Sequence, residues 1–164
     1  MNRVRVTALV LIIGSLALAP AAALHARYLE IAVGRDGNAT VTFEYTLPWI
    51  EQGLAFIGAV NPDRDLGQIL AAATGGKARV LARSPGATSF SVAGFATVSD
   101  ASPHPTYTTA ALNLSWGETG YKSSILAPLL EPDFSPDTTV VRFPDAYSVT
   151  FSDRLVIPSV THAT

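Results

Sequence analysis

The sequence predicts an α+β domain in which a mainly antiparallel sheet of about seven or eight strands carries one packed helix near residues 62–74. Three observations lead to this class. Apolar and polar residues alternate over several short segments, two pairs of such segments flank tight turns, and one further segment repeats its apolar residues at helical spacing. A β-sandwich with an inserted helix is the alternative architecture.

Two hairpins are the clearest features of the pattern. Apolar residues alternate in 27–34 and again in 39–47, and Asp36-Gly37 lies between these segments. Alternation on both sides of Asp-Gly is the strongest short-range signal for a hairpin. The segment 139–151 predicts a second hairpin that turns at Pro144-Asp145-Ala146.

The helix is predicted from its ends as well as its period. Asn61 suits the N-cap, Pro62 suits the first helical position, and acidic residues in the first turn favour the positive end of the helix dipole. Leu66, Ile69, Leu70 and Ala73 recur every three or four residues, and Gly75-Gly76 ends the pattern. We therefore expect one apolar stripe to pack on the sheet.

The remaining strands are predicted in 77–83, 88–99, 107–116 and 155–161. In the third of these segments, Leu112, Leu114 and Trp116 are expected to share one face, with Asn113 on the opposite, exposed face. The segments 48–60 and 121–130 are apolar but favour no element. One domain is expected from residues 27–164.

The first 26 residues predict a secretory signal peptide. Arg3 and Arg5 precede an uncharged apolar run at 6–19, and small residues follow Pro20. This order of basic, apolar and small-residue regions is typical of segments that direct export.

The signal peptide leaves two cleavage positions open. Ala23 closes an Ala-x-Ala motif, and Ala26 is the other position. An uncleaved membrane anchor within residues 6–26 is the alternative, and it would be the only membrane contact. Both interpretations place the domain outside the cytoplasm.

Composition excludes several classes of function. The chain of 164 residues has no cysteine, so it has neither disulfides, cysteine-ligated metals nor a thiol nucleophile. Its formal net charge of −2 gives no basis for nucleic-acid binding, which needs a clustered basic surface. The sequence implies no cofactor.

Catalytic candidates are few. If residues 1–26 are removed, His104 and His162 are the remaining histidines, and neither has the spacing of a metal site. Asp100 and His104 share a loop and are the candidate pair for a hydrolase acting on envelope material. No G-x-S-x-G motif supplies a nucleophile.

An acidic loop offers a candidate calcium site. Glu131, Asp133 and Asp137, together with the Ser135 hydroxyl, supply the oxygen ligands that calcium prefers. Their spacing departs from the EF-hand pattern, and two prolines also favour a stiff, solvated loop. A calcium-stabilised adhesion module is the hypothesis that follows from this cluster.

Two kinds of surface feature complete the candidates. Asn38 and Asn113 begin glycosylation sequons, with Asn38 favoured because it lies in a predicted turn. Trp49 and Phe56 are candidates for a partner surface if they are exposed. Filling of the core by the aromatic residues is the alternative.

The chain resembles small exported proteins of unknown function from archaea, especially methanogens. The resemblance is carried by the signal segment, by RYLEIAVGRDGNATVTFEYTL at 27–47 and by TVVRFPDAYSVTFSDRLVIPSVTH at 139–162. It implies export but no activity. Apart from the resemblance, the β-rich scaffold and the lack of a catalytic motif predict a non-catalytic binding or structural module at the cell envelope, with an envelope protein or a glycan as the candidate partner.

Overall fold

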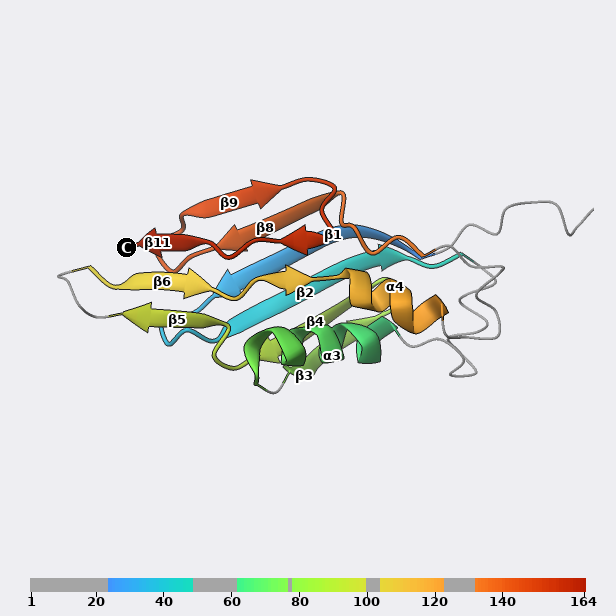
Figure 1. The fold of residues 1–164 in the computed structure, drawn as a ribbon, viewed down its shortest axis with the longest axis horizontal. Helices are drawn as coiled ribbons and strands as arrows, with labels where there is room; N and C mark the ends of the chain where they lie inside the picture. The colour runs from blue at the N-terminus through green and yellow to red at the C-terminus, as the bar shows by residue number, and fades with distance from the viewer. Residues whose placement is uncertain (1–23, 49–61, 77, 100–103, 123–131) are drawn as a thin grey trace, which may run out of the picture.

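The computed structural model describes residues 24–48, 62–76, 78–99, 104–122 and 132–164. A long six-stranded sheet forms one layer, and two helices with two short sheets form a second layer over one of its faces (Figure 1). This arrangement confirms the predicted α+β class with a β-rich sheet.

The elements have the following bounds. The strands are β1 (His25–Val33), β2 (Ala39–Thr46), β3 (Ala78–Ser84), β4 (Ala87–Val92), β5 (Ala96–Ser99), β6 (Thr106–Thr109), β7 (Leu112–Asn113), β8 (Thr138–Arg142), β9 (Ser148–Phe151), β10 (Val156–Ile157) and β11 (Thr161–Ala163). The helices are α3 (Pro62–Thr74) and α4 (Ser115–Lys122).

The large sheet has the strand order β3-β4-β2-β1-β8-β9. Its neighbouring strands are antiparallel except for β1 and β8, which run parallel. The two predicted hairpins, β1–β2 and β8–β9, are therefore confirmed, and they lie side by side. Ile31 pairs with both Val41 and Val141, so the buried face continues from one hairpin to the other.

The first hairpin turns at Asp36-Gly37 as expected. The Gly37 amide donates to the Gly34 carbonyl over 3.1 Å, and Gly37 has a φ of 78°. A Cβ at this position would lie 2.3 Å from the carbonyl oxygen of Ala96. Both the positive φ and this close approach require glycine.

Helix α3 has the predicted bounds, and its N-terminus is attached to the sheet. Asp63 accepts a hydrogen bond from the Thr88 hydroxyl, and its second oxygen lies 2.9 Å from Nε of Arg83. Leu66 and Leu70 lie fully buried below the helix. Burial and the negative charge of Asp63 raise the pKa of the nearby Tyr45 hydroxyl.

The prediction of one continuous strand over residues 107–116 is wrong. This segment forms β6, then β7, and a helix begins at Ser115. The side-chain oxygen of Asn113 accepts hydrogen bonds from the Ser115 amide over 3.1 Å and from the Ser115 hydroxyl over 2.7 Å, which satisfies a donor at the helix start. Leu112 and Leu114 are buried, but helical geometry turns Trp116 outward, and it is 60% exposed.

Two other expected strands divide in the structure. The segment 88–99 separates into β4 and β5, and Gly94 between them has a φ of 63°. The segment 155–161 separates into β10, which pairs with β7, and β11, which pairs with β6. Pro158 follows β10 directly and cannot donate a ladder hydrogen bond.

The core lies between the large sheet and the covering layer. Its largest fully buried side chains include Phe43, Phe90, Phe95 and Phe134. Leu24, before β1, is also part of this core. Within the described residues, no helix is long and apolar enough to cross a membrane; the predicted signal segment up to residue 23 lies outside them.

Candidate functional site

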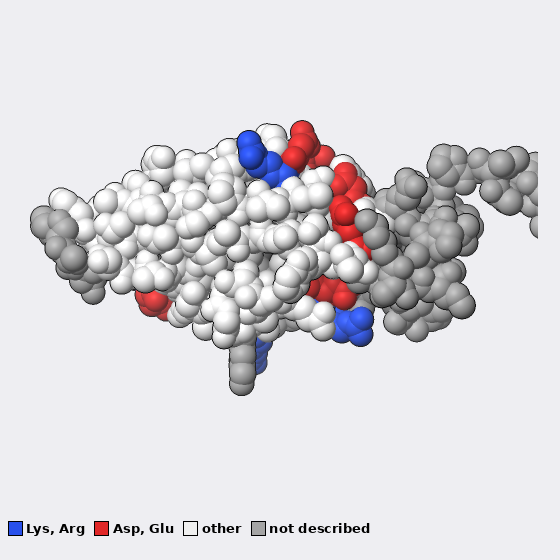
Figure 2. Space-filling model, viewed as in Figure 1, with Lys and Arg blue, Asp and Glu red and all other residues white. Residues whose placement is uncertain are grey.

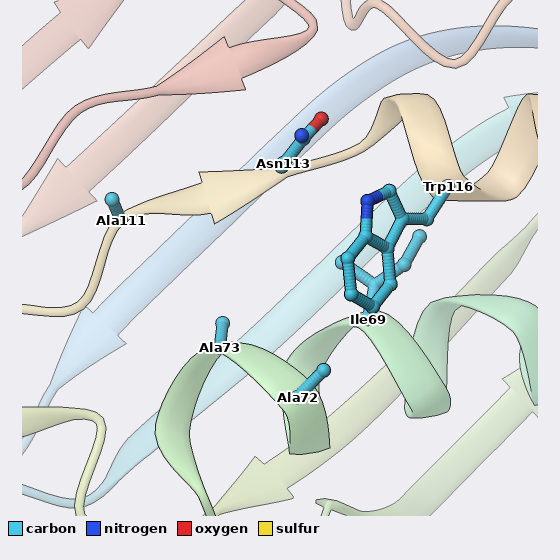
Figure 3. A pocket seen from close by; sticks show the side chains of 6 residues that line it. All are labelled: Ile69, Ala72, Ala73, Ala111, Asn113 and Trp116. Atoms are coloured by element: carbon cyan, nitrogen blue, oxygen red, sulfur yellow. The ribbon is translucent and has the colours of Figure 1, made fainter.

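An open hollow lies between α3 and the segment that leads from β7 into α4 (Figure 3). Its volume is about 150 Å³. The lining residues are Ile69, Ala72, Ala73, Ala111, Asn113 and Trp116. Figure 3 shows the Trp116 indole projecting from α4 over Ile69 of α3.

Local sequence explains this shape. Ala72 and Ala73 have the smallest side chains that still favour a helix, so α3 leaves space at this position. Ile69 is buried and forms an apolar wall. The side-chain oxygen of Asn113 accepts a hydrogen bond from the amide of Ser115, the first residue of α4. Trp116 therefore lies in the first turn of this helix, where its side chain is exposed.

The hollow combines an apolar ring face with one polar group. The side-chain oxygen of Asn113 accepts hydrogen bonds from Ser115, whereas Nδ2 of Asn113 makes no hydrogen bond to any described residue. Binding sites for small molecules are typically apolar with a few polar groups that fix the orientation of the ligand. The exposed Trp116 indole and the Asn113 N–H₂, which has no partner among the described residues, are groups of these two kinds.

The lining of the hollow is uncharged. None of its lining residues is ionisable. Figure 2 shows the face that carries the helices and short sheets, and the acidic and basic side chains lie toward its edges rather than over its middle. A ligand bound here would therefore exchange water for apolar and amide contacts rather than for an ion pair.

No protein-family model, curated protein or solved structure matches this chain.

Of the candidate pair Asp100 and His104, only His104 lies within the described residues. His104 is exposed and makes no hydrogen bond or ion pair with another described residue. Asp100 lies outside the described residues. The structure therefore gives this pair no geometry from which a general base could be argued.

A different histidine is paired with an aspartate. His162 Nε2 lies 2.8 Å from Asp145 Oδ2, and the imidazole stacks on Tyr147 with ring centroids 4.1 Å apart. The hydrogen bond from His162 lowers the pKa of the Asp145 carboxyl. Sequence analysis missed this pair because β11 brings His162 to the β8–β9 turn only through long-range pairing.

The His162–Asp145 pair lacks the third group of a hydrolase. It borders a second hollow of about 320 Å³, lined by Arg35, Pro105, Tyr107, Pro144, Asp145 and Thr164. A catalytic histidine must reach the hydroxyl that it activates. Among the described residues, however, the hydrogen bonds of the His162 ring go to Asp145 alone.

Two carboxylates of the acidic loop, those of Asp133 and Asp137, lie against the imidazole of His25. His25 Nε2 lies 3.0 Å from Asp137 Oδ1, and Nδ1 lies 3.5 Å from Asp133 Oδ2. The Ser135 hydroxyl, a candidate ligand, donates to Asp133. No group of three potential ligands that could hold a metal occurs among the described residues, and Glu131 lies outside them.

The two sequons differ in their amide contacts. Asn38 and Asn113 are both exposed. The Asn38 Nδ2 donates to Asp36 over 2.5 Å, and its oxygen accepts from the Gly94 amide over 2.9 Å. Among the described residues, only the side-chain oxygen of Asn113 makes hydrogen bonds, both of them with Ser115. The candidate partner residues Trp49 and Phe56 lie outside the described residues.

Proposed function

We propose that this protein is an extracytoplasmic, non-catalytic binding module of the cell envelope, and that the hollow at Trp116 holds an uncharged segment of envelope glycan. The observation that carries the proposal is that the exposed Trp116 indole lines the same hollow as Asn113, whose Nδ2 makes no hydrogen bond to another described residue. Export is supported by the signal-like segment within residues 1–26 and by the resemblance to exported archaeal proteins.

A sugar ring suits this combination of groups. One face of a pyranose presents C–H groups, which can lie against the Trp116 ring and the small side chains of α3. Its hydroxyl oxygens can accept from the Asn113 amide. Because the lining is uncharged, a charged ligand would lose its hydration without gaining a counter-ion.

The binding experiment uses the exported protein and envelope polysaccharide purified from the source cells. The protein is produced in a host without N-glycosylation, because a glycan on Asn113 would itself fill the hollow. Titration is followed by tryptophan fluorescence and by co-sedimentation. We expect saturable binding that Trp116→Ala weakens by about tenfold or more, equivalent to at least ~1.4 kcal/mol.

Two further variants sharpen the result. Asn113→Asp keeps an oxygen for Ser115 but removes the amide donor, so it should weaken binding without unfolding α4. Tyr147→Ala removes an exposed aromatic residue outside the hollow and should leave binding unchanged.

The outcomes separate the hypotheses. If the wild-type protein binds no envelope polysaccharide, the proposed function is wrong. Equal binding by wild type, Trp116→Ala and Asn113→Asp would place the ligand elsewhere. Release of reducing ends from the polysaccharide would instead support the envelope hydrolase, and a melting temperature lowered by EDTA would support the calcium-stabilised module.

A further inference from the structure

Residues 24–26 belong to the folded domain. Leu24 is 1% exposed and Ala26 is 0% exposed, and both are part of the apolar core. His25 and Ala26 pair with Thr46 and Tyr45 at the end of β2. His25 and Ala26 are therefore the first residues of β1, and Leu24 directly precedes them in the same core.

The same residues hold the segment that leads into β8. The Asp133 amide donates to the Leu24 carbonyl over 2.8 Å, and the Ala26 amide donates to the Asp133 carbonyl over 2.9 Å. The Asp137 amide donates to the Ala26 carbonyl over 3.3 Å. The His25 side chain adds ion pairs with Asp133 and Asp137 when it is protonated.

This attachment positions a large core residue. Phe134 lies between the two attached aspartates in sequence and is 0% exposed. Its ring stacks on Phe43 of β2, with centroids 6.3 Å apart and ring planes 10° apart. Removing 24–26 would leave the Asp133 and Asp137 backbone groups without these partners and would detach the backbone on either side of Phe134.

We infer that the export machinery cleaves the Ala23–Leu24 bond, so that the mature protein begins at Leu24. Small residues at 21 and 23 satisfy the Ala-x-Ala requirement for this bond. Cleavage after Ala26 would place the bulkier Leu24 three residues before the cut, and it would remove the contacts that residues 24–26 make with β2 and with the segment before β8. The inference depends on the export that is part of the proposed function.

The reaction is a hydrolysis. The peptidase adds water across the amide: hydroxide joins the carbonyl carbon of Ala23, the C–N bond breaks, and the proton goes to the Leu24 nitrogen. The products are a released peptide ending in the Ala23 carboxylate and a mature chain with a free Leu24 α-amino group.

The test expresses the full chain in an export-competent host and determines the N-terminal sequence and intact mass of the processed protein. Ala23→Phe puts a bulky residue next to the cut and should lower the yield of processed chain by about tenfold or more. Ala22→Phe is the matched control, because the middle position of Ala-x-Ala has no size requirement.

We expect an N-terminus at Leu24 for wild type and Ala22→Phe, and accumulation of precursor for Ala23→Phe. An N-terminus at Arg27, or normal processing of Ala23→Phe, would overturn the inference while leaving the glycan-binding proposal intact. Met1 retained on an exported, membrane-attached chain would also overturn only the inference. Met1 retained on a cytoplasmic chain would contradict both the inference and the proposed location.

Discussion

The ring of Phe134 lies directly against the backbone of Gly117. A Cβ built on Gly117 would be 2.7 Å from both Cδ1 and Cε1 of Phe134, closer than such atoms approach in folded proteins. Helix α4 can therefore sit on the segment before β8 only because its third residue has no side chain. The contact joins two parts of the chain that neither hairpin contains.

Gly117→Ala is expected to destabilise the protein by roughly 1–3 kcal/mol, although alanine favours helices over glycine by ~1 kcal/mol. Gly67→Ala in α3 is the matched control, because Cε1 of Phe90, at 3.4 Å, is the only atom of the described residues that its Cβ would meet. That variant should be neutral or slightly more stable. Urea unfolding measures both, and equal stability of the two variants would show that the Phe134 ring can move aside.

Phe134→Ala and Trp116→Ala should differ strongly in the free energy of unfolding. Truncation of the buried Phe134 leaves a cavity and is expected to cost about 3–5 kcal/mol. Truncation of the exposed Trp116 should change stability by no more than ~0.5 kcal/mol. A loss of several kcal/mol in Trp116→Ala would assign this residue to the core and remove the basis for the binding site.

Asn113→Ala should cost about 1 kcal/mol, because the Ser115 amide at the start of α4 loses its acceptor. Asn113→Asp retains an oxygen acceptor and should stay within a few tenths of a kcal/mol of wild type. Thermal unfolding of the two variants checks the cap. Identical melting temperatures for Asn113→Ala and wild type would show that the hydrogen bond contributes nothing to stability.

The Asp145–His162 pair should make stability depend on pH in acid. Because the hydrogen bond to His162 lowers the pKa of Asp145 in the folded state, the unfolded state binds the proton more readily. The stabilisation is present above the unfolded pKa of ~3.9 and is lost as the pH falls through the folded pKa. Asp145→Asn should remove this part of the pH dependence.

Urea midpoints measured between about pH 6 and pH 2 provide the check. Asp153→Asn is the control, since Asp153 is an exposed aspartate without an ion pair to another described residue. Its profile should parallel that of wild type. If Asp145→Asn also parallels wild type, the hydrogen bond to His162 does not influence the stability of the fold.

Much of the fold could be predicted because its signals are local. Asp36-Gly37 between two alternating segments predicts the β1–β2 hairpin, since turn geometry sets the register of both strands. Pro62 and the apolar spacing through Ala73 predict α3 with its observed bounds. The exposure of Asn113 was also predicted correctly. Trp116 was not, because an alternating pattern cannot indicate that a helix begins one residue earlier.

The candidate sites depend on contacts that the sequence does not bring together. His162 reaches Asp145 only because β11 pairs with β6 and lies near the β8–β9 turn. The hollow needs α3 and α4 side by side, and α4 was not predicted. Its one signal, Asn113 two residues before a serine and three before Trp116, also fits a continuing strand.

By itself, the sequence determined the β-rich class, the two hairpins and the position of the long helix, because each follows from the period of neighbouring residues and from turn chemistry. Only the tertiary structure decided that residues 24–26 belong to the domain, that Trp116 faces solvent and that His25 occupies the acidic loop. A β-bulge between Ala26 and Tyr28 interrupts the alternation just where β1 begins. Burial at that point is decided by the segment packed against it, which lies about a hundred residues further along the chain.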